Sequence, residues 1–324
     1  MSFTVRKYSA EDKLVWNEFV AVSKNATFLF HRDFMDYHKD RFLDHSLLVF
    51  KKTKPLAIFP ATNSDGTIIS HAGLTYGGLV VKKDLKLKDV LLAFQAVLKY
   101  YHEKGIPKVI LKQMPSIYTS YPSEGIDYAA FILKAKITRV DVSSSVALSA
   151  PLNIQKNRLE GVKKAKKQGL TVKEETSFDA FWKEILIPNL QKRHGAQPVH
   201  SLSEITQLQQ YFPKKIKQFN VYQETRLVAG ATIFEMPHLV HVQYISSNDD
   251  RQQLGALDFL FHYLIKERYS SKSYFDFGTS NEDRGKSINE GLLYWKECFG
   301  ARAIVHRFFD FNTANYPLLD SVWI

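Results

Sequence analysis

Three residues in the second half of the sequence have side chains suited to accepting or donating a proton. Asp276 lies in the strand-like segment SYFDFG, and His241 and Tyr244 lie in LVHVQYIS, the strand-like segment before it. Side chains of these types act as general acids and bases within hydrogen-bond reach of a reacting group. We take Asp276 as the first candidate for a general base and His241 and Tyr244 as the next. The alternatives are a structural carboxylate for Asp276 and a hydrogen-bonded core histidine for His241.

A turn that could bind phosphate follows LVHVQYIS. It comprises Gln252, Gln253, Leu254, Gly255 and Ala256, where a polar run gives way to a predicted helix over residues 254–268. Backbone amides at a helix N-terminus lack partners, and the helix dipole favours negative charge there. Glycine would let a phosphate approach the chain closely. The turn therefore predicts a pyrophosphate site, with a plain helix-capping turn as the alternative.

A second place where anions could bind is the basic segment KNRLEGVKKAKK, residues 156–167. It holds six basic residues and one glutamate, and its lysines include Lys163, Lys164, Lys166 and Lys167. Such a cluster is typical of contacts with phosphates or nucleic acid. The alternative is the solvated face of a helix.

Composition restricts the class of protein. The 324 residues are 45% hydrophobic and 13% aromatic, enough for two globular cores. The net charge of +11 favours anionic partners such as phosphate cofactors, RNA or acidic envelope polymers. The single cysteine, Cys298, rules out an internal disulfide and a thiolate zinc cage. Motifs for metal hydrolases, nucleotide triphosphates and serine hydrolases are absent from the sequence, so we expect no metal.

The order of predicted elements is repeated along the chain. Each half reads as two helices, three antiparallel strands, a long helix, a strand, a shorter helix and a closing strand or strand pair, which in the first half is ITRVDVS and SVALS. We therefore predict a mixed α/β (α+β) fold of two domains, residues 1–150 and 151–324, each a mostly antiparallel central sheet flanked by helices. The place in the first half that matches the phosphate turn reads LVVKKDLKLKDV, without glycine, so only the second domain should bind a nucleotide-like donor.

The order strand, polar turn, helix, strand, helix, with the spacing Gln252-x-x-Gly255, resembles the acyl-CoA-binding half of the GNAT N-acyltransferase fold. The family turn is Arg/Gln-x-x-Gly-x-Gly/Ala, and Leu257 departs from it at the last small residue. The resemblance implies an acyl-CoA donor, most simply acetyl-CoA. It also implies that a backbone amide near Ile245, Ser246 and Ser247 stabilises the oxyanion. The general acid that many such enzymes carry is not assigned, because Trp295 stands at its position and Tyr294 one residue earlier.

Two such halves in tandem, one of them degenerate, resemble the Fem-type transferases that add amino acids to peptidoglycan precursors. The segments that carry this resemblance are NRLEGVKKAKKQGL, HVQYISS, FDFGTSNE and WKECFGAR. It implies an envelope-precursor acceptor and an aminoacyl-tRNA donor. However, the long helical hairpin of some Fem-type enzymes has no counterpart in this sequence, which favours acyl-CoA over aminoacyl-tRNA.

The sequence as a whole predicts an N-acyltransferase that moves an acyl or aminoacyl group to an amine. A small molecule or an envelope precursor is the expected acceptor, with tRNA as a further possible partner. The start, MSFTVRKYSAEDK, has no apolar signal core, and no apolar run reaches the length of a membrane helix, so we expect a cytoplasmic protein. The alternative is a non-catalytic module that binds RNA or an anionic envelope polymer on a degenerate transferase fold.

Overall fold

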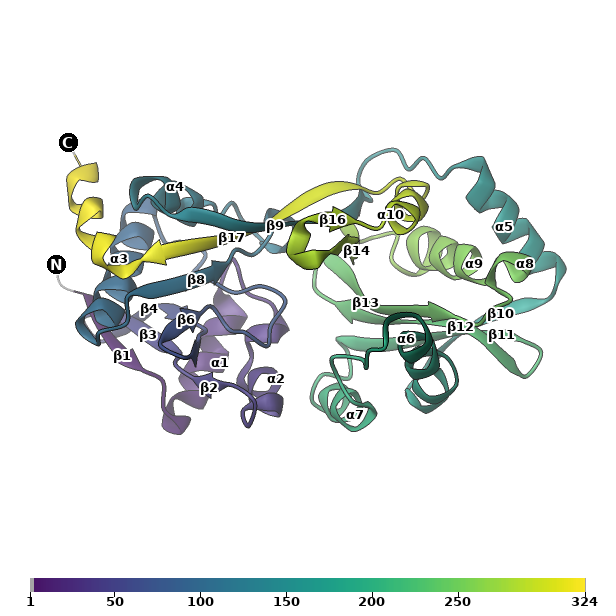
Figure 1. Cartoon of the computed structure of the whole chain (residues 1–324), viewed down its shortest axis with the longest axis horizontal. Helices are drawn as coiled ribbons and strands as arrows, with labels where there is room; N and C mark the ends of the chain where they lie inside the picture. Colours follow the sequence, from purple (N-terminus) through teal and green to yellow (C-terminus); the bar gives the residue numbers. More distant parts are fainter. Residues whose placement is uncertain (1–2, 324) are drawn as a thin grey trace. The chain divides into compact units, whose positions relative to one another are not determined.

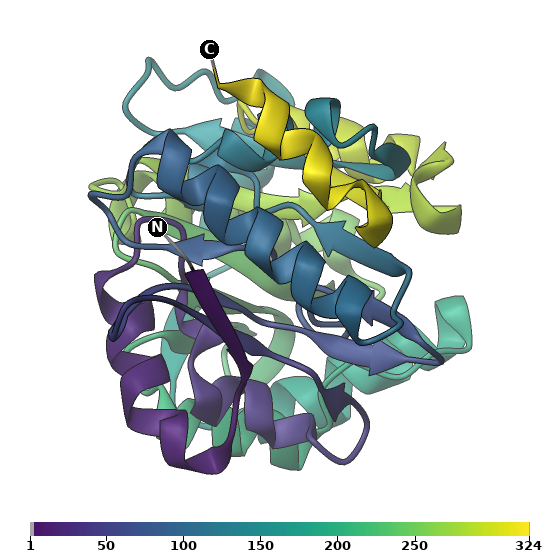
Figure 2. The same ribbon diagram turned by 90° about the vertical axis from the view of Figure 1, so that its left-hand side faces the viewer.

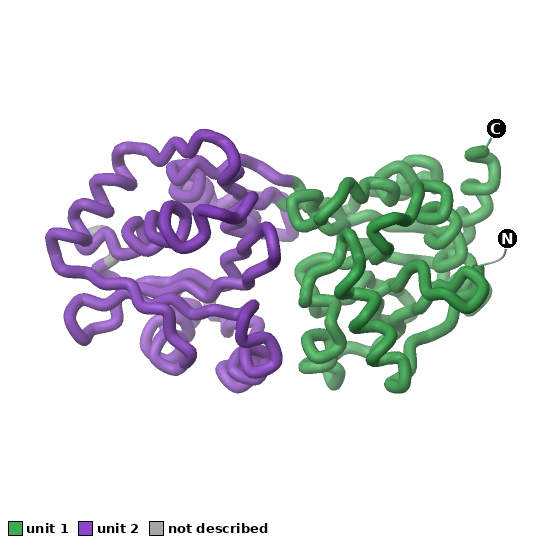
Figure 3. Tube along the Cα trace, turned by 180° about the vertical axis from the view of Figure 1, so that it is seen from behind, with its two compact units in different colours: residues 1–141, 305–324 green, residues 142–304 purple. Residues whose placement is uncertain are grey.

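The computed structural model describes residues 3–323, without the side chains of His194, Arg251 and Gln252. The chain folds into two compact units (Figure 3). Unit 1 comprises Met1–Asp141 and Val305–Ile324, and unit 2 comprises Val142–Ile304. The chain passes from unit 1 to unit 2 within strand β9 (Lys136–Ala147) and returns within strand β17 (Arg302–Asn312).

These units differ from the two halves of the sequence at the C-terminal end. A boundary after residue 150 assigns residues 305–324 to the second domain, whereas in the structure they pack in unit 1. Strand β17 pairs antiparallel with β8 (Lys108–Lys112), and the 3₁₀-helical segment Thr313–Val322 packs on α3 (Leu87–Glu103). Phe309, Phe311 and Leu319 thereby complete the core of unit 1, so burial of apolar surface decides where this segment lies.

Unit 1 contains a four-stranded sheet in the order β1-β3-β4-β7, and a second set of strands in which β17, β8, β6, β5 and β2 are successive neighbours. Helix α3 covers the core because its apolar residues recur at helical spacing, and the helix ends before Gly105, whose φ is positive. The remaining elements are β1 (Phe3–Lys7), α1 (Lys13–Val22), α2 (Arg32–Met35), β2 (Leu43–Asp44), β3 (Leu47–Lys51), β4 (Lys54–Phe59), β5 (Thr62–Ser64), β6 (Thr67–Ile69), β7 (Val80–Val81) and α4 (Gly125–Ile132).

Unit 2 is built on strands in the order β10-β11-β12-β13-β14-β9, antiparallel except for the parallel pair β13 and β14. Helices α5, α9 and α10 lie on one face of this sheet, and α6 and α7 lie on the other (Figure 1). The elements are α5 (Lys156–Lys167), β10 (Leu170–Glu175), α6 (Ile187–His194), α7 (Leu202–Tyr211), β11 (Ile216–Gln223), β12 (Arg226–Glu235), β13 (Leu239–Ser247), α8 (Arg251–Leu254), α9 (Ala256–Tyr263), β14 (Tyr274–Thr279), β15 (Asn281–Glu282), β16 (Ser287–Ile288) and α10 (Glu290–Glu297).

Three local expectations differ from the structure. The predicted pair ITRVDVS and SVALS is the single strand β9, because its extended backbone continues through the serines between them. Strand β10 was not expected, since its residues LTVKEE lack the apolar alternation of the other strands. The predicted helix over residues 254–268 is interrupted at Gly255 and ends in the π-helical segment Leu264–Arg268.

Within residues 3–323, no helix combines the length and apolar character needed to cross a lipid bilayer.

Candidate active site

The site is built where two parallel strands of unit 2 separate. The pairing of strands β13 and β14 begins with Leu239 opposite Tyr274 and ends with His241 opposite Asp276. Beyond this point β13 continues along β12 as far as Ser247, while β14 bends at Gly278, whose φ is +74°. Glycine tolerates this left-handed conformation without the steric cost of a side chain. The bend therefore takes β14 away from β13 directly after the Asp276 and His241 positions.

The end of β13 turns two backbone amides toward the side that β14 has left. The Asn248 amide donates to the Val228 carbonyl of β12. Because the direction of backbone N–H groups alternates along a strand, the Ser246 amide also faces β12, whereas the Ile245 and Ser247 amides face away from it. Of the three residues expected near an oxyanion, Ile245 and Ser247 thus direct their amides to the side that β14 has left.

A side chain from helix α6 holds the same end of β13. The Asn189 Nδ2 donates to the Ser247 carbonyl at 2.6 Å and to the Ser246 Oγ at 2.8 Å. Sequence reasoning did not single out Asn189, because a lone asparagine in a helical segment carries no recognisable spacing. The bonds fix the strand end relative to the helix.

Asp276 and His241 form a direct pair. Asp276 is 1% exposed; its Oδ2 lies 2.8 Å from the His241 Nδ1, and its Oδ1 accepts a hydrogen bond from the Ser143 Oγ at 2.6 Å. The His241 side chain is 13% exposed and lies over Gly278, where an added Cβ would be 3.3 Å from Cε1. The carboxylate is therefore buried behind the imidazole, whose ring it can orient through the Nδ1 contact. Of the two side chains, that of His241 is the more exposed.

Tyr244 points to a different set of partners. Its hydroxyl lies 2.6 Å from the His200 Nδ1 and accepts a hydrogen bond from the His200 backbone amide at 3.0 Å. Its ring packs edge-on against Trp182. Burial raises the pKa of Tyr244 to about 12, although the His200 amide opposes the shift. Tyr244 therefore stays protonated at neutral pH and anchors the segment before α7 to β13.

Lys296, on α10, braces the bent part of β14 and was missed in the sequence. It is 2% exposed, and its Nζ donates to the Gly278 carbonyl at 2.9 Å and to the Thr279 carbonyl at 2.7 Å. Burial lowers the pKa of Lys296 to about 8, and the nearby Asp276 carboxylate opposes this shift. The available signal was a lysine directly after the apolar run LLYW. Ser143 was also missed, within a run of three serines.

The predicted phosphate turn is packed closely against helix α5 at Gly255. Gly255 separates α8 from α9 with φ of +67°, and an added Cβ would overlap the carbonyl oxygen of Gly161 on α5. Gly161 in turn packs on the Asp258 carboxylate. The space beside Gly255 is thus filled by helix packing, and the structure gives this glycine a packing role that the sequence did not indicate.

The other turn residues have mixed environments. Leu254 and Ala256 are buried in the core of unit 2, and the Gln253 carbonyl accepts a hydrogen bond from the Gln168 Nε2 at 3.0 Å. The side chain of Gln252 lies outside the described residues. Two carboxylates precede the turn: Asp249, 3.0 Å from the Lys192 ammonium, and Asp250, 2.8 Å from the Arg226 guanidinium.

The four lysines of the basic segment share the solvent side of α5. Val162 and Ala165 are buried, and the Arg158 guanidinium bonds to the Asp258 carboxylate at 2.9 Å. The side chains of Lys163, Lys164, Lys166 and Lys167 are exposed. Since α5 also packs on α8 and α9, these lysines belong to a helix that adjoins the turn.

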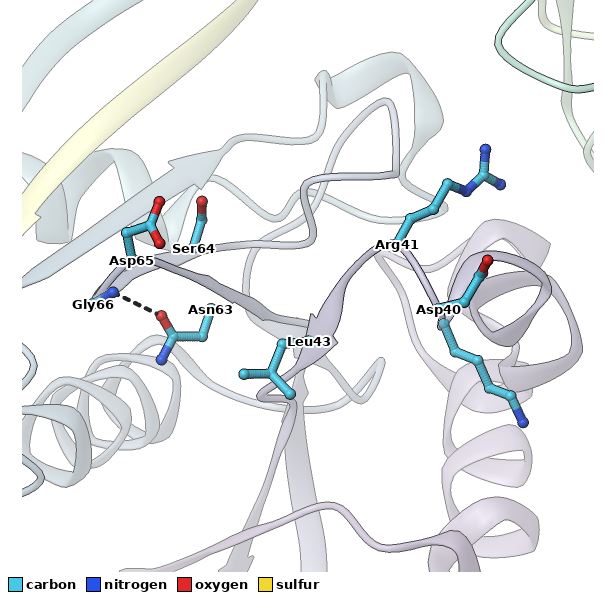
Figure 4. Close-up of a pocket in the computed structure, with 8 residues that line it drawn as sticks. Asp40, Arg41, Leu43, Asn63, Ser64, Asp65 and Gly66 are labelled. Carbon is cyan, nitrogen blue, oxygen red and sulfur yellow. Dashed lines mark hydrogen bonds between the residues drawn. The ribbon is translucent and has the colours of Figure 1, made fainter.

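Unit 1 has an open pocket of about 640 Å³ between the segment before β2 and the turn joining β5 to β6 (Figure 4). The pocket is lined by Lys39, Asp40, Arg41, Leu43, Asn63, Ser64, Asp65 and Gly66. Its charged side chains are all exposed, and the Asn63 Oδ1 is used by the Gly66 amide at 3.0 Å. These side chains give the pocket no oriented acid–base pair, so unit 2 carries the stronger candidate site. Among the described residues, no group of three or more His, Cys, Asp or Glu side chains is placed to hold a metal ion.

Comparisons with known proteins identify the fold through structure. No protein-family model matches the sequence, and a search of curated protein sequences finds no match. Among solved structures, FemX is similar with a TM-score of 0.67 and 13% identity, over 99% of this chain and 100% of FemX.

Two further solved structures resemble the whole chain. L-PGS from Bacillus licheniformis has a TM-score of 0.60 and 13% identity, over 97% of this chain and 96% of that one. A tandem GNAT protein from the clavulanic acid biosynthesis pathway has a TM-score of 0.56 and 11% identity, over 96% and 99%. The mixed α/β fold of two GNAT-like halves expected from the sequence is confirmed, and this chain has the tandem GNAT fold, with FemX among its structural neighbours.

Proposed function

We propose that the chain is a GNAT-fold transferase that moves an acyl or aminoacyl group onto an amine, with its reaction centre where β13 and β14 separate. The observation that carries the proposal is the buried Asp276 carboxylate bonded to the His241 imidazole, next to the strand end whose Ile245 and Ser247 amides are turned outward. Acyl transfer needs a proton acceptor and an oxyanion donor, and this arrangement supplies both.

The chemistry assigns one role to each group. The acceptor amine attacks the carbonyl carbon of the donor, a new C–N bond forms, and the carbonyl oxygen takes negative charge facing the amides of Ile245 and Ser247. His241 accepts the proton that the amine loses. When the tetrahedral intermediate collapses, the donor's thiolate or alkoxide leaves and is protonated. Asp276 serves as a positioning residue, because both its oxygens are used by Ser143 and His241.

Our first choice of donor is acyl-CoA, with acetyl-CoA as the simplest case. The backbone amides of the Gln252–Ala256 turn can bind a pyrophosphate at the start of a helical segment. Helix α5 covers Gly255 on one side, so the phosphates would reach the turn from its other side. Binding there must also overcome the carboxylates of Asp249 and Asp250, which their cationic partners neutralise in part.

The second candidate donor is an aminoacyl-tRNA, and the exposed lysines of α5 favour it. Lys163, Lys164, Lys166 and Lys167 present a row of positive charge beside the turn, which suits a phosphate backbone. The same lysines are the basis of the alternative function, a non-catalytic module that binds RNA or an anionic envelope polymer. These alternatives make opposite predictions about His241, because a binding module does not need a proton acceptor.

A donor and acceptor screen tests the proposal. Purified protein is offered acetyl-CoA or aminoacyl-tRNA with a panel of amines that includes polyamines, lysine peptides and envelope precursors. Release of free thiol or deacylated tRNA that depends on the amine and disappears in His241→Ala is the expected result. Binding of either donor is measured separately by titration calorimetry. Turnover that His241→Ala leaves unchanged would place the reaction elsewhere, and RNA binding without turnover with any amine would favour the binding module.

A further inference from the structure

Unit 1 exposes a set of large apolar side chains that its own fold leaves uncovered. Phe131 and Tyr128 on α4 are 79% and 42% exposed, Leu87 at the start of α3 is 50% exposed, and Trp323 is 39% exposed. Tyr121, in the segment before α4, is 48% exposed. Single exposed apolar residues are common, but a contiguous group marks an interaction surface.

Contacts join these residues into one surface. Gly125, one turn before Tyr128 on α4, packs against Leu87, since an added Cβ on this glycine would lie 3.0 Å from the Leu87 Cδ1. The next residue, Lys88, places its Nζ 5.0 Å from the centre of the Trp323 ring. Phe131 follows Tyr128 by three residues on the same face of α4. The C-terminal helical segment Thr313–Val322 packs on α3 (Figure 2). The Gln95 Nε2 of α3 donates to the Asp320 Oδ1 of this segment at 2.8 Å.

Lysines surround this apolar group. In segments 83–88, 124–136 and 313–323 the exposed charged residues are the five lysines 83, 86, 88, 134 and 136, against the three acids Asp84, Glu124 and Asp320. The Lys83 Nζ lies 4.3 Å from the centre of the Tyr121 ring. We call Leu87, Tyr121, Tyr128, Phe131, Trp323 and these lysines the aromatic–lysine patch. Its net charge is positive, and its Tyr121, Tyr128 and Trp323 side chains have polar tips.

We infer that the aromatic–lysine patch binds the surface of an anionic lipid bilayer. Tryptophan and tyrosine rings are favoured at the level of lipid headgroups, phenylalanine and leucine can enter the acyl boundary, and lysine ammonium groups bind headgroup phosphates while their stems cover apolar surface. Negative lipid charge complements the lysines. The inference does not depend on the proposed transfer reaction.

Two other occupants fit the patch less well. Protein interfaces are depleted in lysine relative to the rest of the surface, whereas lysines surround this patch. Single-stranded nucleic acid binds by stacking bases on open aromatic faces. Here lysine ammonium groups lie over the rings of Tyr121 and Trp323, which restricts stacking on those faces.

Co-sedimentation of the full chain with lipid vesicles tests the inference. We expect binding to vesicles of equal parts phosphatidylcholine and phosphatidylglycerol, weaker binding as salt increases, and little binding to phosphatidylcholine alone. The double variant Leu87→Asp, Phe131→Asp should reduce the partition coefficient about tenfold or more. The matched control is Leu14→Asp on α1, which alters a residue that is 75% exposed and outside the patch. Its binding should equal that of the unchanged chain.

Tryptophan fluorescence gives a second readout. Trp16 and Trp182 are fully buried and Trp295 packs on the core of unit 2, whereas Trp323 is exposed. A blue shift on adding anionic vesicles should therefore come from Trp323 and be lost in Trp323→Phe. Circular dichroism melting checks that each variant folds. Equal binding of the double variant and the unchanged chain would overturn the inference. So would binding that Leu14→Asp reduces equally, or patch-dependent binding of a homopolymeric RNA without vesicle binding.

Discussion

Units 1 and 2 each bury a lysine that holds two backbone carbonyls, and the surroundings of the two lysines differ. In unit 1 the Lys112 Nζ donates to the carbonyls of Ala72 and Leu74, and in unit 2 the Lys296 Nζ donates to those of Gly278 and Thr279. The charged neighbour that acts on Lys112 is the cationic Arg139, whereas the one that acts on Lys296 is the Asp276 carboxylate.

The buried lysine is a structural feature that both units share, whereas the carboxylate–imidazole pair occurs at the candidate site of unit 2. A buried lysine can fix a segment in either unit, because its ammonium group donates to two backbone carbonyls. What distinguishes unit 2 is the carboxylate–imidazole pair at diverging strands. The glycine-containing turn also belongs to unit 2 alone, since the corresponding segment of unit 1, Lys82–Lys86, leads into α3 without glycine.

The largest expected effect comes from Gly255→Ala. The new Cβ would overlap the Gly161 carbonyl oxygen at φ of +67°, so we expect unit 2 to lose roughly 2–5 kcal/mol of unfolding free energy from overpacking and backbone strain. Chemical denaturation measures the loss. The matched control is Gly105→Ala in unit 1, where φ is +72° but an added Cβ meets no atom within 4 Å among the described residues. It should lose only about 1–2 kcal/mol. Equal losses of unfolding free energy in the two variants would mean that packing of α5 against Gly255 adds nothing to the cost.

The next effect concerns the acid–base pair. His241→Ala should lower turnover by ~10²-fold or more, since general base catalysis typically contributes that much. Donor affinity should change little, because His241 is assigned to the proton and not to the phosphates. The His102→Ala variant of unit 1, at the end of α3, serves as a control and should keep its turnover. A loss confined to donor affinity would assign His241 to binding instead.

Asp276→Asn sharpens the same comparison. The amide keeps the size of the side chain but cannot stabilise an imidazolium, so we expect turnover to fall ~10²-fold and the pH profile of the remaining activity to shift. A structural role alone would change the melting temperature and leave the pH profile of turnover unaltered. Turnover within a few-fold of the unchanged chain would show that His241 works without the carboxylate.

The two buried lysines predict a measurable pH dependence of stability. Burial lowers the pKa of Lys112 from the ordinary 10.5 to about 7 and that of Lys296 to about 8. Between each folded-state pKa and 10.5 the unfolded chain binds more protons, so the unfolding free energy should rise with pH across that window, by at most about 1.4 kcal/mol per pH unit for each lysine. Lys112→Met should remove this slope from about pH 7 upward, and Lys296→Met from about pH 8. Parallel stability curves for variant and unchanged chain would contradict the assignment.

The smallest effect on folding is expected for α5. Replacing Lys163, Lys164, Lys166 and Lys167 with Gln should weaken binding of tRNA or another polyanion and reduce its salt dependence, because fewer counterions are released. Unfolding free energy should stay within about 0.5 kcal/mol, since these side chains are exposed. Replacing Lys99 and Lys104 of α3 is the control. If the affinity for polyanions at low salt is unchanged, the four lysines form only the solvated face of α5 and do not bind a polyanion.

The sequence alone determined the tandem fold class and most of its elements. Apolar spacing in α3 and alternation along β13 are local patterns, because each depends on one element burying one face. The same reasoning named Asp276 and His241 as candidates, since their residue types and neighbouring strands are visible in the chain. It ranked Asp276 first because burial cannot be seen in a sequence.

Tertiary structure decided what those residues contact. Ser143 and Asp276 are 133 positions apart, and their bond exists only because β9 pairs with β14. The packing role of Gly255 depends on Gly161 of a helix far earlier in the chain, and the membership of residues 305–324 in unit 1 depends on the pairing of β17 with β8. Such contacts arise from apolar surfaces that many arrangements could bury, so local patterns cannot specify which distant segment fills each place.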